Sequence, residues 1–111
     1  MLNFFKSAKV ITISPQEAHE RARKGQICLI DVREANEWAQ MRVPGALHAP
    51  LSTLADRLSG LPQDKPMVFY CLSGQRSARA VKLCQSLGKP CDTHVAGGIT
   101  AWRAAGLPIE R

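Results

Sequence analysis

The sequence predicts an α/β fold in which a mostly parallel sheet of about five strands has helices on both faces. Short apolar and β-branched runs alternate with longer segments of helical periodicity. The connections between them are short, and a helix that crosses between two strands leaves those strands parallel. Residues 27–32 are almost continuously apolar, which is typical of a central parallel strand buried on both faces.

Local signals define the first two elements. Residues 10–13 alternate between apolar and other residues and are expected to form an edge strand. Ser14 is suited to cap a helix, Pro15 fits its first position, and Glu17 would complete a capping box. The helix is expected to end at Gly25, because glycine commonly follows a helix.

The remaining elements continue the alternation. Strands are expected over residues 27–32, 46–49, 66–70 and 93–95, and helices over residues 34–41, 51–58, 78–87 and 99–105. The carboxyl ends of parallel strands meet at one edge of a sheet, where α/β proteins place their ligand sites. Asp31, Cys71 and the Gly97–Gly98 pair lie at such ends, so this edge is the expected site.

The chain has 111 residues, of which 45% are hydrophobic, as expected for a soluble globular domain. We expect one domain over residues 10–111, preceded by a leader over residues 1–9 with a frayed, flexible end. Phe4 and Phe5 could instead dock on the domain or on another chain. The sequence shows neither the ~20-residue apolar run of a membrane span nor the pattern of a signal peptide. A cytoplasmic location is expected, although the chain could be the soluble part of a longer, membrane-tethered protein.

The net charge of +6 and the isoelectric point near 9.6 predict attraction to small anions. Arg76, Arg79 and Lys82 follow Cys71 closely, which favours this interpretation over a basic surface without function. Nucleic acid is not an expected partner, because the sequence has one tyrosine and no recognition motif.

The loop after residues 66–70 carries the clearest functional signal. It consists of Cys71, Leu72, Ser73, Gly74, Gln75, Arg76 and Ser77. The N–H groups of such a loop and the positive end of the next helix would converge on the sulfur, which lowers a thiol pKa and gives a reactive thiolate. Gly74 lets the loop curl, Arg76 offers a cationic fork for an anion, and Ser77 can cap the helix or donate to the thiolate. These neighbours argue against the alternative, a buried and inert cysteine.

The other cysteines lack such a setting. Cys28 and Cys84 fall in apolar patterns and are expected in the core, whereas Cys91 is expected to be more exposed. Because no CxxC pair is present, a zinc site is not expected. A disulfide framework is not expected either, because the sequence lacks export signals.

Polar residues beside the strand ends have two interpretations. Asp31, Arg33 and Glu37 could line the pocket, but a structural network of ion pairs is favoured. Gly97 and Gly98 could let a ligand approach the backbone, or could allow close packing of the last helix.

The histidines and tryptophans receive structural interpretations. Trp38 and Trp102 are expected in the core, and His19 on an exposed helix face. His48 and His94 have no sequence link to Cys71, so the loop itself would have to activate the thiol.

Four motifs occur once each along the chain. They are Leu29–Glu34 followed by Glu37 and Trp38, the stretch Val43–Ala46, the Cys71 loop, and Val95–Trp102, before an ending of Ala105–Ile109. In this order and spacing the chain resembles a single-domain member of the rhodanese family of sulfurtransferases, over about residues 13–109. Members often carry histidine where this chain has Arg42, which changes the local charge and no catalytic role.

The resemblance implies a rhodanese-like three-layer fold and a sulfurtransferase activity. Cys71 would take sulfur from a donor such as thiosulfate as a persulfide and pass it to cyanide or a thiol, without cofactor or metal. Residues 72–77 would stabilise the anionic sulfur, Arg76 would hold the donor, and Asp31 and Arg33 would support the loop. A sulfur-accepting protein could also be a partner.

Three other functions compete with this one. Phosphatases and arsenate reductases of related fold place five residues between cysteine and arginine, whereas four separate Cys71 from Arg76, so the smaller loop favours sulfur over phosphate. The domain could also be a persulfide carrier or interaction module that serves a partner protein. A catalytically inactive binding domain is disfavoured, because the Cys71 loop is intact.

Overall fold

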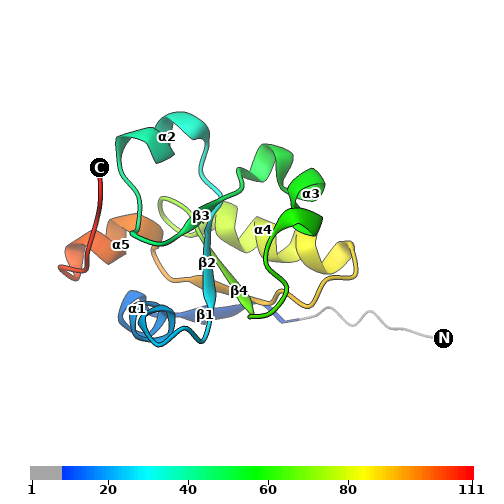
Figure 1. The fold of residues 1–111 in the computed structure, drawn as a ribbon, viewed down its shortest axis with the longest axis horizontal. Coiled ribbons are helices and arrows are strands. Elements are labelled where there is room, and N and C mark those ends of the chain that lie inside the picture. Colours follow the sequence, from blue (N-terminus) through cyan, green and yellow to red (C-terminus); the bar gives the residue numbers. More distant parts are fainter. Residues whose placement is uncertain (1–8) are drawn as a thin grey trace.

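The computed structural model describes residues 9–111, so Phe4, Phe5 and nearly all of the expected leader lie outside the described residues. Five parallel strands form one sheet in the order β1-β5-β4-β2-β3 (Figure 1). They are β1 (Ile11–Ile13), β2 (Cys28–Asp31), β3 (Leu47–His48), β4 (Met67–Tyr70) and β5 (Thr93–Val95). The structure confirms the expected fold class and places β1 at an edge.

Helices cover both faces of the sheet. They are α1 (Pro15–Arg23), α2 (Ala35–Gln40), α3 (Leu54–Arg57) between two 3-10 turns (Leu51–Thr53 and Leu58–Gly60), α4 (Gln75–Ser86) and α5 (Gly98–Ala104). Side chains of α1 and α5 pack on one face, and those of α3 and α4 pack on the other. The result is the three-layer arrangement that the sequence predicts.

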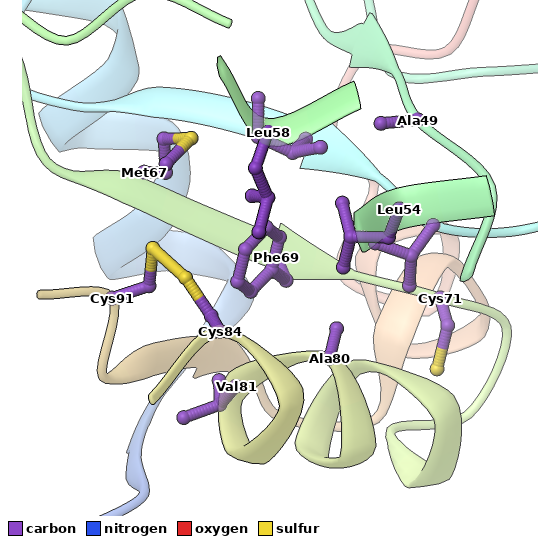
Figure 2. Packing of buried hydrophobic residues seen from close by; sticks show 12 residues of the cluster. Ala49, Leu54, Leu58, Met67, Phe69, Cys71, Ala80, Val81, Cys84 and Cys91 are labelled. Carbon is purple, nitrogen blue, oxygen red and sulfur yellow. A yellow bond between two sulfur atoms is a disulfide. The ribbon is translucent and has the colours of Figure 1, made fainter. Parts of the chain in front are cut away.

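Strand β4 joins the two halves of the core. Met67 and Phe69 point into the cluster beneath α3 and α4, which Figure 2 shows, whereas Val68 and Tyr70 point into the cluster beneath α1 and α5. Successive side chains of a strand face opposite sides of the sheet, so a strand covered on both faces must be apolar throughout. Because β4 ends at Tyr70, it places Cys71 at the carboxyl edge of the sheet.

The start of α1 differs in one detail from the expectation. The Ser14 hydroxyl accepts a hydrogen bond from the Glu17 N–H at 3.0 Å, as a helix cap requires. The Glu17 carboxylate does not close a capping box but forms an ion pair with Arg21 one turn later. A reciprocal cap occurs at α2 instead, where the Glu34 N–H donates to the Glu37 carboxylate at 3.0 Å.

The expectation that disulfides are absent is wrong. Cys84 of α4 and Cys91 of the loop before β5 form a disulfide, with Cα atoms 6.0 Å apart (Figure 2). Cys91 is buried rather than exposed. Because α4 packs against β5, the apolar side of the helix brings Cys84 next to the chain that enters the strand. The presence or absence of export signals carries no information about this proximity.

We expect the disulfide to stabilise the domain without serving the chemistry of Cys71. Replacing both Cys84 and Cys91 by alanine should lower the free energy of unfolding by about 2 kcal/mol or more, because a cross-link is lost and buried sulfur is removed. Denaturant unfolding with and without dithiothreitol measures this, and the alkylation rate of Cys71 is the control. An unfolding midpoint that dithiothreitol leaves unchanged in the wild type would contradict the expectation.

Candidate active site

Cys71 lies directly after β4, and α4 begins four residues later. Its side chain is only 1% exposed. Figure 2 shows the sulfur directed away from the core side chain of Leu54. The Gly74 and Ser77 N–H groups donate to Sγ at 3.1 and 3.3 Å, and the Ser77 Oγ lies 3.5 Å from Sγ. The loop therefore surrounds the sulfur with hydrogen-bond donors, as the sequence suggests.

The loop makes Cys71 more acidic than an ordinary thiol. Burial raises the pKa of Cys71, but hydrogen bonds from Ser77, Gly74 and Ser73 lower it by more, so that the net pKa lies below its ordinary value. In contrast, burial raises the pKa of Cys28. Of the two cysteines outside the disulfide, Cys71 is the one whose pKa is lowered by its surroundings.

The amino end of α5 holds the loop in place. The Ile99 N–H donates to the Cys71 carbonyl at 2.8 Å, and the Thr100 N–H donates to the Leu72 carbonyl at 3.1 Å. Gly98 has a φ of +59°, and a Cβ on it would lie 2.4 Å from the Cys71 carbonyl oxygen. Of the two roles left open for the Gly97–Gly98 pair, the structure shows close packing of the helix on the loop.

Arg76 pairs with Glu37 of α2. Its two terminal nitrogens donate to the two carboxylate oxygens at 2.7 and 2.9 Å, and both side chains are partly buried. The hydrogen bond from Arg76 is the main reason why the pKa of Glu37 falls to about 2. These two residues could not be paired from the sequence, because α2 and α4 are far apart along the chain. The role of Arg76 in holding a donor stays a prediction.

Asp31 and Arg33 form a buried ion pair beside the loop. The Arg33 guanidinium contacts both carboxylate oxygens of Asp31 at 2.8–3.1 Å and donates to the Met41 carbonyl at 2.7 Å. The His48 Nε2 contacts the Arg33 carbonyl at 2.8 Å. These contacts tie β2 to the segment after α2. Asp31 and Arg33 therefore form a structural ion-pair network, which is the role favoured from the sequence.

His94 has no sequence link to Cys71, yet the structure places it in contact with the loop. It lies on β5 next to β4, and its Nδ1 is 2.7 Å from the Ser77 Oγ. Ser77 therefore lies between Cys71 and His94 and contacts both side chains. No sequence pattern indicates this contact, because it depends on which strand lies beside β4.

The rest of the loop faces outward. Leu72 is 45% exposed, and Ser73 and Gln75 are also exposed. Their side chains are therefore accessible to solvent beside the buried Cys71 sulfur.

The sequence predicts Trp38 in the core, but the structure places it partly exposed at the surface. It stacks on His48 with ring centres 4.7 Å apart, while the Arg42 guanidinium lies 5.0 Å from its ring centre. Arg42 also pairs with Glu110 at 3.2 Å, so its charge is used within the fold. Trp102, in contrast, is buried as expected.

The ion pair of Glu37 should make stability depend on pH. Its folded-state pKa is depressed from 4.5 to about 2, so the pair stabilises the fold above pH 4.5 and loses this contribution as the pH falls towards 2. Glu37→Gln should therefore melt below the wild type at pH 7. The difference in Tm should narrow between pH 4.5 and 2, and a constant difference would contradict the assignment.

Within residues 9–111, no helix is both long enough and apolar enough to cross a membrane. The cytoplasmic location expected from the sequence stays a prediction.

Comparison with known proteins supports the resemblance seen in the sequence. Residues 14–105 match the family model of the rhodanese-like domain. A sulfurtransferase of Allochromatium vinosum is 39% identical over 83 residues, which cover 75% of this chain and 78% of the relative. A solved thiosulfate sulfurtransferase of Pseudomonas aeruginosa has a TM-score of 0.80 and 29% identity, over 97% of this chain and 21% of that one.

Some relatives are much longer than this chain. The probable adenylyltransferase/sulfurtransferase MoeZ of Mycobacterium tuberculosis is 38% identical over 99 residues, which cover 86% of this chain. The match covers 25% of that relative, so this chain spans about a quarter of its length. Since the family model covers most of the described residues and the cysteine loop has the geometry above, the chain belongs to the rhodanese-like domain family.

Proposed function

We propose that the chain is a sulfurtransferase that carries sulfane sulfur as a persulfide on Cys71. The observation that carries the proposal is the buried Cys71 sulfur, which receives N–H groups from Gly74 and Ser77. These donors lower the pKa of the thiol and would also stabilise the negative charge on an added sulfur atom. The names of relatives and structural neighbours support sulfur transfer, and the name of one neighbour supports thiosulfate as donor.

The reaction would proceed in two steps. The Cys71 thiolate attacks the outer sulfur of thiosulfate, a Cys71 S–S bond forms, and the donor S–S bond breaks as sulfite leaves with the bonding electrons. An acceptor then attacks the terminal sulfur and releases the thiolate, so that cyanide becomes thiocyanate and a thiolate becomes a persulfide. Each step conserves charge, and the covalent intermediate predicts ping-pong kinetics.

Intact-protein mass spectrometry after thiosulfate treatment tests this function. The wild type should gain the mass of one sulfur atom, and cyanide or dithiothreitol should remove it. Cys71→Ser, treated in parallel, should gain nothing. If neither protein carries an adduct with thiosulfate or with persulfide donors, the proposed function is wrong.

We keep Arg76 as the residue that holds an anionic donor. Arg76→Ala should raise KM for thiosulfate, whereas Glu37→Gln leaves the guanidinium in place and releases it from its partner, so KM should stay the same or fall. If both variants raise KM equally, Arg76 acts only through its ion pair with Glu37.

Persulfide carriage for a partner protein is the second candidate. It is favoured by the match of this chain to one part of a longer relative. A persulfide that forms readily but turns over slowly with cyanide and small thiols would support the carrier, and rapid turnover would support the independent enzyme. A phosphatase is less favoured, because only four residues separate Cys71 from Arg76, which makes the loop smaller than a phosphatase loop.

A further inference from the structure

A row of hydrogen-bonded polar side chains leads from Cys71 to the edge strand β1. The Ser77 Oγ lies 3.5 Å from the Cys71 Sγ and 2.7 Å from the His94 Nδ1. On the other side of the imidazole ring, Nε2 lies 3.2 Å from the Thr12 Oγ1 of β1. His94 is 7% exposed and Ser77 is fully buried, whereas Thr12 reaches the surface.

The number of protons limits which hydrogen bonds these side chains can form at the same time. The Ser77 hydroxyl has one hydrogen but three neighbours that can accept it: the Cys71 sulfur, the His94 Nδ1 and, at 3.2 Å, the Gly74 carbonyl. If the imidazole proton is on Nε2, Nδ1 competes for the serine hydrogen at the shortest distance. If the proton is on Nδ1, that nitrogen donates to Ser77, and the serine hydrogen can point to the sulfur.

The protonation state of Cys71 decides between the two arrangements. A neutral thiol can donate its hydrogen to the Ser77 Oγ, which then donates to Nδ1. A thiolate or persulfide needs a donor instead, which Ser77 supplies only when Nδ1 carries the imidazole proton. Burial lowers the pKa of His94, which keeps the ring neutral, so these two tautomers are the relevant states.

We propose that His94 is a positioning residue for sulfur transfer, which donates from Nδ1 to Ser77 and thereby directs the Ser77 hydroxyl onto the anionic sulfur of Cys71. As Cys71 ionises, its proton passes to Ser77, the serine proton passes to Nδ1, and the Nε2 proton leaves through Thr12 to water. His94 is neutral before and after. The role in transfer rests on the proposed function, whereas the effect on the thiolate does not.

The pH dependence of Cys71 alkylation tests the proposal in a Cys28→Ser background, in which Cys71 is the cysteine outside the disulfide. His94→Leu should lower the iodoacetamide rate at neutral pH about tenfold and shift the profile upward, because a hydrogen bond to a charged group is lost. Arg76 of α4 interacts electrostatically with Cys71, and its ion pair with Glu37 is left in place in these variants. His19→Leu, which alters a histidine on α1 beside Trp102, should leave the profile unchanged.

A double-mutant comparison separates positioning from a structural effect. If His94 acts through Ser77, then Ser77→Ala and the Ser77→Ala/His94→Leu double variant should have the same profile. His94→Asn, which can keep a donor near Ser77, should lie closer to the wild type than His94→Gln, which reaches towards Thr12. Additive effects in the double variant, or a wild-type profile in a folded His94→Leu, would overturn the proposal.

Imidazole ¹⁵N chemical shifts supply a second readout that needs no variant. The His94 proton should move from Nε2 to Nδ1 as Cys71 ionises, and one tautomer throughout the Cys71 titration would contradict the proposal. Neither experiment requires a sulfur donor. A missing persulfide would therefore count against the proposed function and would leave the test of His94 intact.

Discussion

Replacing Cys71 by serine should abolish sulfur transfer and leave the fold intact. The rate with thiosulfate and cyanide should fall by at least about a thousandfold, because the reaction loses its covalent intermediate. A serine hydroxyl ionises far less readily than a thiol and forms no persulfide. The same N–H groups of Gly74 and Ser77 remain and can donate to the smaller serine oxygen, so the fold loses little.

Two measurements belong together in this test. Steady-state rates report the loss of transfer, and thermal melting shows whether the fold survives. Cys28→Ser is the matched control, since Cys28 is also outside the disulfide but has a pKa raised by burial. Transfer that persists in Cys71→Ser, or that is lost equally in Cys28→Ser, would show that Cys71 is not the nucleophile.

Features that depend on residues close together in the sequence could be predicted. The Ser14 cap, the fully apolar strand β4 and the loop that leads from Cys71 into α4 all result from local chemistry. The donors to the sulfur come from within six residues of it, so the activation of the thiol can be predicted from the local sequence.

Features that depend on strand order could not be predicted in the same way. The pair Arg76–Glu37 joins two helices, and His94 reaches Ser77 because β5 lies beside β4. The Cys84–Cys91 disulfide likewise depends on how α4 packs against the chain entering β5. A sequence pattern shows which face of an element is apolar, but it does not show which polar side chains meet across the fold.

The glycine at position 98 is the point where the last helix fixes the geometry of the loop. An alanine Cβ there would lie 2.4 Å from the Cys71 carbonyl oxygen and 2.5 Å from backbone atoms of Leu72. These are backbone atoms that cannot rotate away, so α5 would have to move. Such a shift would break the hydrogen bonds from Ile99 and Thr100 that orient the carbonyls of Cys71 and Leu72.

Gly98→Ala should therefore impair both stability and the reactivity of Cys71. We expect a loss of about 2–4 kcal/mol in unfolding free energy, from the positive φ together with the clash. The pKa of Cys71 should rise, because the N–H groups of the loop no longer converge on its sulfur. Denaturant unfolding and the pH profile of Cys71 alkylation measure the two effects.

Gly106→Ala separates the clash from the backbone strain. Gly106 has a φ of +75° near the end of α5, and a Cβ on it would meet nothing within 4 Å. Its substitution should cost only about 1 kcal/mol and leave the pH profile of Cys71 unchanged. If Gly98→Ala and Gly106→Ala lose equal stability and both keep the wild-type profile, the contact with α5 does not shape the loop. A selective effect of Gly98→Ala would show that the reactivity of Cys71 depends on a helix that begins 27 residues after it.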